Sequence, residues 1–279
     1  MPELPEVEVT RQALSPHVTG QIWVGAVIRE SRLRHPVPQE LASSDPQQVL
    51  QVRRRGKYLV LEMSHGALIV HLGMSGTLRY LTQAVPAQRH EHVDLLFADG
   101  SLVRYRDPRR FGALLWVPRP PEVSGAPFWQ THPCFSRMGL EPLEAGFDGV
   151  WFYRVTRGLK GAIKPLLLEG RLVVGAGNIY ACESLFLAGI DPRRAAGRIG
   201  LERYHRLAQA VRQVLEQAIQ AGGSTLRDFV GALGEGGYFQ HQHQVYGRTG
   251  QPCARCATPI VQIRQGQRST WYCPRCQRF

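Results

Sequence analysis

Short runs that alternate apolar and polar residues fill the chain between Gln21 and Trp116. They read "QIWVGAVI", "YLVLEM", "ALIVHLGM", "TLRYL", "HVDLLFADGSLVRYRD" and "ALLWV", and their period of two predicts β-strands. Asp99-Gly100 predicts a tight hairpin between two alternating runs. The glycine in "RRRGKYLV" predicts another hairpin, with Lys57 just past the turn. An antiparallel sandwich or barrel is therefore expected in this half.

In the second half the apolar period changes to that of a helix. The residues that share one stripe of "LERYHRLAQAVRQVLEQAIQAGG" are Leu201, Tyr204, Leu207, Ala208, Val211, Leu215 and Ile219. "NIYACESLFLAGI" predicts a shorter helix entered through the glycine-rich "VGAGN". A further helix is predicted over residues 2–14, whose prolines and glutamates suit a first helical turn. "VPRPPEVSGAPF" has the composition of a linker between two domains.

The charge balance narrows the class of partner. Of 279 residues, 34 are Lys or Arg and 22 are Asp or Glu, which gives a net charge of +12. This excess favours a polyanion, most commonly nucleic acid, although each arginine cluster is also compatible with a solvated face. No apolar run reaches the roughly 18 residues that cross a bilayer, and the N-terminus lacks the pattern of a signal peptide. We therefore expect a cytoplasmic protein without a membrane partner.

Cysteine spacing near the end of the chain predicts a metal site. Two CxxC pairs separated by sixteen residues supply Cys253, Cys256, Cys273 and Cys276. This spacing suits one structural Zn²⁺ with four thiolates and no open position. Disulfides are the alternative, which a reducing cytoplasm disfavours. Cys134 and Cys182 are expected to be ordinary core residues. Between the pairs, the sequence predicts a hairpin that turns at Gln265-Gly266, with Arg268 just past the turn.

The first residues, "MPELPEVEVT", allow two interpretations. If Met1 is removed, Pro2 becomes a secondary amine at the terminus, with Glu3 directly behind it. An α-amino group has a pKa near 8, against about 10.4 for lysine, so more of it is neutral and nucleophilic at pH 7. Glu3 can then serve as the general acid–base group. Alternatively, Pro2 merely begins a helix and Glu3 caps it, which these residues alone favour.

Several longer motifs occur together in one order. They are "MPELPEVE", "HLGMSGTLR" at 71–79, "HEHVDLLFADG" at 90–100, "RDPRRFGALLW" at 106–116, "AIKPLLLEGRLVVGAGNIYACESLF" at 162–186 and "GYFQHQHQVYGRTGQPC" at 237–253, followed by the zinc segment. Nearly end to end, the chain resembles the bacterial formamidopyrimidine-DNA glycosylase family. The resemblance implies an α+β fold: an N-terminal antiparallel β-sandwich with flanking helices, then a helical helix–two-turn–helix domain with a β-hairpin zinc finger. The expected boundaries are 1–118 (catalytic sandwich), 119–135 (linker), 136–245 (helix–two-turn–helix) and 246–279 (zinc finger).

The resemblance also implies roles for single residues. Pro2 would be the nucleophile, Glu3 the acid, Lys57 a phosphate contact that assists elimination, and Arg268 the residue that binds phosphates flanking the lesion. Glu6 would support the terminus. The void left by a base swung out of the duplex would be filled by Met74, Arg109 and Phe111, a set that the endonuclease VIII branch lacks. Further DNA contacts would come from His71, His90, Arg109, Lys160 and Asn178.

Several of these residues also have a plainer interpretation. Met74 and Phe111 would more often be core residues, the histidines structural, and Lys57 an exposed turn lysine. Lys160 could share a solvated basic helix face with its neighbours Arg154, Arg157 and Lys164. The glycine-rich stretch at 231–237 and "QHQHQ" at 240–244 depart from the family pattern, which bears on lesion preference.

The function implied is a bifunctional DNA glycosylase and abasic-site lyase of base-excision repair. It would release 8-oxoguanine and formamidopyrimidines from duplex DNA and cleave the strand by β,δ-elimination. The expected partner is double-stranded DNA with an oxidised purine or abasic site, bound by a monomer that contains one structural Zn²⁺. The alternatives are an endonuclease VIII-like enzyme for oxidised pyrimidines and a non-catalytic zinc-finger protein that binds damaged DNA.

Overall fold

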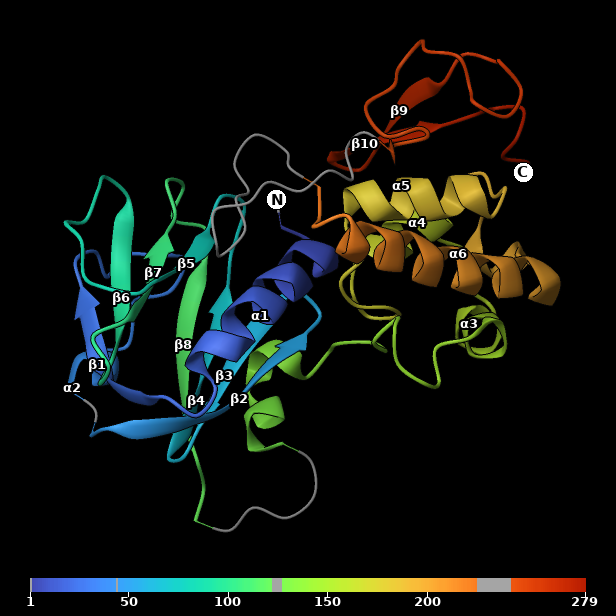
Figure 1. The fold of residues 1–279 in the computed structure, drawn as a ribbon. Helices are drawn as coiled ribbons and strands as arrows, with labels where there is room; N and C mark the ends of the chain where they lie inside the picture. Colours follow the sequence, from blue (N-terminus) through green and yellow to red (C-terminus); the bar gives the residue numbers. More distant parts are fainter. Residues whose placement is uncertain (1, 44, 122–126, 225–241) are drawn as a thin grey trace. The chain divides into compact units, whose positions relative to one another are not determined.

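The computed structural model describes residues 2–43, 45–121, 127–224 and 242–279. The chain divides into two compact units, Met1–Ser136 with Ala221–Tyr238, and Arg137–Gln220 with Phe239–Phe279. The first contains an antiparallel sheet, and the second contains helices and a two-stranded hairpin (Figure 1). The predicted α+β fold is confirmed.

Eight strands form the sheet of the first unit, hydrogen-bonded in the order β5-β7-β6-β1-β2-β3-β4-β8. Their bounds are β1 Ile22–Ile28, β2 Gln47–Arg55, β3 Tyr58–Met63, β4 Gly66–His71, β5 Thr77–Leu81, β6 Glu91–Phe97, β7 Leu102–Arg106 and β8 Ala113–Pro118. Trp23 in β1 packs against Trp116 in β8, with ring centroids 5.8 Å apart, although three strands separate β1 from β8 in the hydrogen-bond order. The two halves of the sheet therefore face each other across one core, as in a sandwich.

Helix α1, Leu4–Val18, covers one side of this sheet and contacts β2 and β3 (Figure 1). Glu3 is its N-cap, and the Glu3 N–H donates to Glu6 Oε2 over 2.8 Å in a capping box. The helix continues four residues beyond the predicted end, through Pro16. It does so because Leu14 and Val18 are both fully buried, and this tertiary burial outweighs the local cost of the proline. The short helices of this unit are α2 Glu40–Ser43, η1 Phe128–Thr131 and η2 Pro133–Phe135.

Helices are the main regular elements of the second unit. They are α3 Gly149–Thr156, α4 Ile163–Leu168, α5 Asn178–Leu187, η3 Ala196–Arg198 and α6 Leu201–Gln220. Both predicted helices, α5 and α6, are confirmed. Gly149 permits close contact between α3 and α6, because a Cβ there would lie 2.5 Å from the His205 backbone. No helix in the described parts of the chain is long and apolar enough to cross a membrane.

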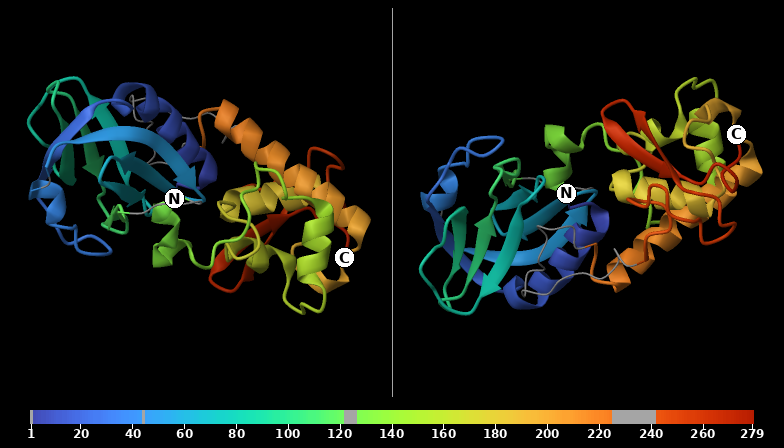
Figure 2. Two further views of the ribbon diagram at one scale, coloured as in Figure 1. Left: turned by 90° about the horizontal axis from the view of Figure 1, so that it is seen from below. Right: turned by 90° about the horizontal axis from the view of Figure 1, so that it is seen from above.

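A hairpin of β9, Val261–Gln265, and β10, Arg268–Tyr272, completes the second unit, and β10 packs against α5 (Figures 1 and 2). The turn lies one residue later than predicted. Gln265 pairs directly with Arg268, so Gly266 and Gln267 are the two turn residues, and Gly266 has a left-handed φ of +59°. Arg268 is therefore the first residue of β10, and it is exposed.

Candidate functional site

Two loops of the first unit, residues 72–76 and 107–112, lie together and form what we call the ridge. A Cβ on Gly73 would lie 2.5 Å from backbone atoms of Phe111 and Gly112, so the two backbones are in direct contact. Met74 is half-buried, whereas Arg109 is exposed and Phe111 is 48% exposed. The Arg109 guanidinium carbon lies 5.0 Å from the Phe111 ring centroid. The structure thus brings the three predicted void-filling residues together, and Phe111 does not belong to the core.

Lys57 and His71 lie at neighbouring strand ends of the same unit. Lys57 lies in the two-residue turn between β2 and β3, and His71 is the last residue of β4. Burial, with the charges of Lys57 and Arg34, lowers the pKa of His71 to about 4. The Gly73 N–H donates to His71 Nδ1 over 3.0 Å, which leaves the proton of the neutral ring on Nε2. His71 can therefore offer a neutral hydrogen-bond donor to a phosphate, without a positive charge.

A cavity of about 490 Å³ adjoins His71. Its wall includes Arg34, His35, His132 and Cys134. Burial raises the pKa of the Cys134 thiol to about 11, so this cysteine is a thiol and not a thiolate at neutral pH. Cys134 is half-buried, less enclosed than the core position expected from the sequence.

The buried His71 should make folding stability depend on pH. Its pKa is lowered in the folded chain, so the unfolded chain binds the proton first as the pH falls below about 6.5. Stability is then fully present above pH 6.5 and is lost as the pH falls towards 4, by about 2 kcal/mol at pH 5 relative to pH 7.5. Urea unfolding of wild type and His71→Gln across this range measures the difference. Identical dependence of stability on pH in the two proteins would show that His71 does not have a lowered pKa in the folded chain.

The N-terminal residues are enclosed at the start of α1. Pro2 is buried, and Glu3 is 2% exposed. Glu3 thus caps the helix, as expected if Pro2 only begins it. The same cap also fixes Glu3 directly beside Pro2. The second oxygen of Glu6, Oε1, accepts the Ser224 N–H over 2.7 Å. Glu6 therefore supports both the backbone next to Pro2 and the end of the segment that precedes residues 225–241. The predicted glycine-rich loop at 231–237 lies outside the described residues.

The remaining predicted DNA contact of the first unit, His90, lies just before β6 and is half-buried. Its φ of +71° is in the left-handed region, which is uncommon for a residue with a side chain. Partial desolvation and the charges of Arg89 and Arg106 lower the pKa of His90. Like His71, it therefore favours the neutral form.

In the second unit, Asn178 is the first residue of α5, after the N-cap Gly177. Its Nδ2 donates to the Ser269 carbonyl over 3.0 Å, and its Oδ1 accepts from Lys164 Nζ over 2.6 Å. Lys164 Nζ also lies 3.3 Å from the same carbonyl. Asn178 and Lys164 therefore hold the residue next to Arg268 against the start of α5.

The interpretation of Lys164 as part of a basic helix face with Lys160 is wrong. Lys160 is exposed in the irregular segment before α4, whereas Lys164 lies within α4 and is fully buried. Sequence reasoning missed the positioning role of Lys164. The available signal was a lysine within the apolar run "AIKPLLL", where a charge requires a buried partner.

Replacing Lys164 should therefore destabilise the second unit. We expect Lys164→Met to lower the free energy of unfolding by about 2–4 kcal/mol, because a buried, charge-assisted hydrogen-bond donor is lost. Lys160→Met is the matched control, since the exposed side chain should change stability by less than about 0.5 kcal/mol. Thermal unfolding compares the two variants, and equal midpoints would refute the role of Lys164.

The four predicted zinc ligands converge in the second unit. Their sulfur atoms all lie within 4.8 Å of one another: Cys253, Cys256, Cys273 and Cys276. The Cys253–Cys276 and Cys256–Cys273 sulfurs are 3.9 and 3.5 Å apart, close to the edge of about 3.8 Å for a tetrahedron with Zn–S bonds of about 2.3 Å. The six cysteines are all free of disulfides. The Arg255 and Cys276 N–H groups point to the Cys253 and Cys273 sulfurs at 3.4 Å, as suits thiolate ligands. The cluster can bind one structural zinc ion.

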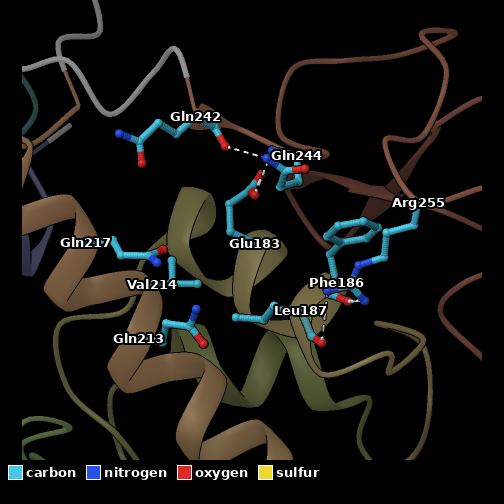
Figure 3. Close-up of a pocket in the computed structure, with 9 residues that line it drawn as sticks. All are labelled: Glu183, Phe186, Leu187, Gln213, Val214, Gln217, Gln242, Gln244 and Arg255. Atoms are coloured by element: carbon cyan, nitrogen blue, oxygen red, sulfur yellow. Dashed lines mark hydrogen bonds between the residues drawn. The ribbon is translucent and has the colours of Figure 1, made fainter.

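Another cavity, of about 470 Å³, lies between α5, α6 and the segment around Gln244 (Figure 3). The Glu183 carboxylate in its wall accepts the N–H groups of Gln244, Val245 and Tyr246 at 2.8–3.0 Å. Arg255 donates to carbonyls at the end of α5 over 3.4 Å. None of the predicted site residues lines this cavity. Its charged groups hold the chain leading to the zinc site against α5.

Comparison with known proteins gives three consecutive family matches. The formamidopyrimidine-DNA glycosylase N-terminal domain matches residues 1–114, the H2TH domain of the same glycosylase matches 138–230, and a zinc finger found in FPG and IleRS matches 250–278. The chain is 52% identical to the formamidopyrimidine-DNA glycosylases of Janthinobacterium sp. and of Herminiimonas arsenicoxydans, with complete coverage of both chains in each comparison.

Solved structures agree with these matches. A mutant Lactococcus lactis FPG in complex with Fapy-dG containing DNA is 35% identical, with complete coverage of both chains and a TM-score of 0.88. MutM in complex with carbocyclic 8-oxo-G containing DNA matches equally completely, at 35% identity and a TM-score of 0.87. With the ridge, the capped N-terminus and the four-cysteine cluster in place, the chain belongs to the formamidopyrimidine-DNA glycosylase family.

Proposed function

We propose that this protein is a DNA glycosylase that excises oxidised purines, such as 8-oxoguanine and formamidopyrimidines, from duplex DNA. The observation that carries the proposal is the full-length identity of 52% to formamidopyrimidine-DNA glycosylases. The Fapy-dG and 8-oxo-G complexes of structural relatives support the lesion class. The net charge of +12 suits a DNA partner.

The chemistry begins at the Pro2 nitrogen, freed by removal of Met1. This secondary amine attacks C1′ of the damaged nucleotide as the bond from C1′ to the base breaks, and Glu3 protonates the ring oxygen as the sugar opens. The resulting iminium withdraws electrons from the sugar. Loss of a C2′ proton then expels the 3′ phosphate, and loss of the C4′ proton from the unsaturated iminium expels the 5′ phosphate. Burial of Glu3 beside Pro2 supports its role as the acid.

DNA contacts come from both units. We assign Lys57, His71 and His90 to phosphates near the lesion, and Met74, Arg109 and Phe111 to the void left by the extruded base. The exposed Phe111 and the adjacent Arg109 suit insertion into a base step. In the second unit we assign Lys160, Asn178 and Arg268 to phosphates, with the zinc-bound hairpin as the rigid support of Arg268.

We further propose that the protein acts as a monomer in the cytoplasm. Its domains would be residues 1–118, a linker at 119–135, the helix–two-turn–helix domain at 136–245 and the zinc finger at 246–279. The change of unit between Ser136 and Arg137 lies within one residue of the second of these boundaries, whereas residues 221–238 group with the first unit.

Oxidised pyrimidines are a second candidate substrate class. The specific observation is a wild-type Lactococcus lactis FPG complex with an oxidized pyrimidine containing DNA, 35% identical with a TM-score of 0.87. Excision rates should be measured under single-turnover conditions on duplexes that carry 8-oxoguanine, formamidopyrimidine-guanine, an oxidised pyrimidine or an abasic site.

Faster release of the two purine lesions is the result that the proposal predicts. Preference for the oxidised pyrimidine would move the protein to the endonuclease VIII-like alternative. Tight binding without excision of any lesion, with a verified Pro2 terminus, would indicate a damage-binding protein that is not an enzyme.

A further inference from the structure

Asp107 lies at the base of the ridge and is fully buried. Its Oδ1 accepts hydrogen bonds from the Ser75 hydroxyl at 2.6 Å and the Arg109 N–H at 3.3 Å. Its Oδ2 accepts from the Tyr105 hydroxyl at 3.0 Å and the Gly112 N–H at 2.9 Å. The carboxylate thus binds four donors, two on each oxygen, and both ridge loops contribute to them.

The backbone of Asp107 extends this arrangement to the His90 loop. Its N–H donates to the His90 carbonyl over 3.0 Å, and its carbonyl accepts from His92 Nε2 over 2.8 Å. The carbonyl also accepts the Arg110 N–H over 3.2 Å. Both His90 and Arg110 have left-handed φ values, +71° and +56°, which are strained for residues with side chains. Such conformations persist only where the surroundings over-determine them, and here the bonds to Asp107 do so.

We propose that Asp107 is the positioning residue of the ridge. It holds Met74, Arg109 and Phe111 in one geometry and thereby determines how well these side chains fill the void and recognise the opposite base. This inference rests on the proposed function of the ridge. Two of the partners, the Arg109 and Gly112 N–H groups, can only donate, and one of them lies on each carboxylate oxygen. An amide in either orientation would direct its NH₂ group at one of these N–H groups, and the two loops would separate.

The isosteric variant Asp107→Asn tests this role. We expect it to lower kcat/KM on a duplex with 8-oxoguanine opposite cytosine on the order of 10²-fold, because small misplacements have effects of this size. Discrimination between cytosine and adenine opposite the lesion should weaken as well. Cleavage at an abasic site in single-stranded DNA should stay within about twofold of wild type, because no void exists there.

Two neighbouring variants separate positioning from folding. Ser75→Ala removes the donor that connects the Met74 loop to Asp107. It should therefore also lower kcat/KM on the duplex and leave cleavage of single-stranded DNA unchanged, but with a smaller loss than in Asp107→Asn. Tyr105→Phe removes a donor from β7 that belongs to neither ridge loop, so it should lower the melting temperature with little change in opposite-base discrimination. If Asp107→Asn fails to fold, the comparison of Ser75→Ala with Tyr105→Phe decides the question.

Normal duplex excision and unchanged discrimination in folded Asp107→Asn would overturn the inference. An equal loss of kcat/KM on duplex and single-stranded substrates would also overturn it, because Asp107 would then affect the chemical step and not the ridge. An inactive wild type on both substrates would instead refute the proposed function.

Discussion

A protein with one glycine inserted between Met1 and Pro2 should lose base excision almost completely. The Pro2 nitrogen then becomes a tertiary amide, whose lone pair is delocalised and cannot attack C1′. The new terminal amine would lie one residue away from the buried position that Pro2 occupies. Because the nucleophile is lost outright, we expect the single-turnover excision rate to fall at least about 10³-fold.

DNA binding should change far less than excision in this variant. Its dissociation constant for an abasic-site analogue duplex should stay within about threefold of wild type, since the phosphate contacts are unchanged. Mass spectrometry of both proteins verifies which residue forms the terminus. Undiminished excision by the blocked protein would show that another group is the nucleophile.

Loss of zinc should have the second largest effect, this time on DNA affinity. Cys273→Ser removes a fully buried ligand from the four-cysteine cluster. The zinc segment contributes only a few side chains to a small core that it shares with Cys182 and Phe186 of α5, so it should unfold without the metal. Arg268 then loses its rigid support, and we expect the dissociation constant for lesion-containing duplex DNA to rise on the order of 10²-fold.

Cys134→Ser is the matched control, because Cys134 lies outside the cluster. It should retain one zinc per chain and normal affinity, as measured by metal analysis and fluorescence anisotropy. Circular dichroism should show that the sheet of the first unit stays folded in Cys273→Ser. Full affinity in a zinc-free protein would exclude the scaffold role of the metal.

The strands that the alternating pattern predicts are present, because each buries one face in a single core. The first half of β2 shows where this reasoning fails. In "QQVLQV" a register shift between Val49 and Gln51 interrupts the period of two, and the side chain of Gln47 is buried. Its Oε1 accepts the His65 N–H over 3.1 Å, so a hydrogen bond from a residue distant in the sequence stabilises the buried glutamine side chain. No local pattern carries that information.

Only part of the candidate site could be predicted from the sequence. The cysteine spacing alone indicated the zinc ligands, whereas Met74, Arg109 and Phe111 depended on the family resemblance. Asp107 and Lys164 were not identified by either route. Both are polar residues whose roles arise from burial and from partners that are distant in sequence, such as Ser75 and Ser269. Such roles become visible only when the fold brings the donors and acceptors together.

The most direct test of the proposed chemistry is to trap the covalent intermediate with borohydride on a duplex with 8-oxoguanine opposite cytosine. Hydride reduces the iminium to a stable amine that links protein and sugar. We expect one adduct per chain, with the cross-linked peptide mapping to Pro2 and no adduct from the glycine-inserted variant. A cross-link at Lys57 or another lysine, or efficient trapping of the glycine-inserted variant, would contradict it.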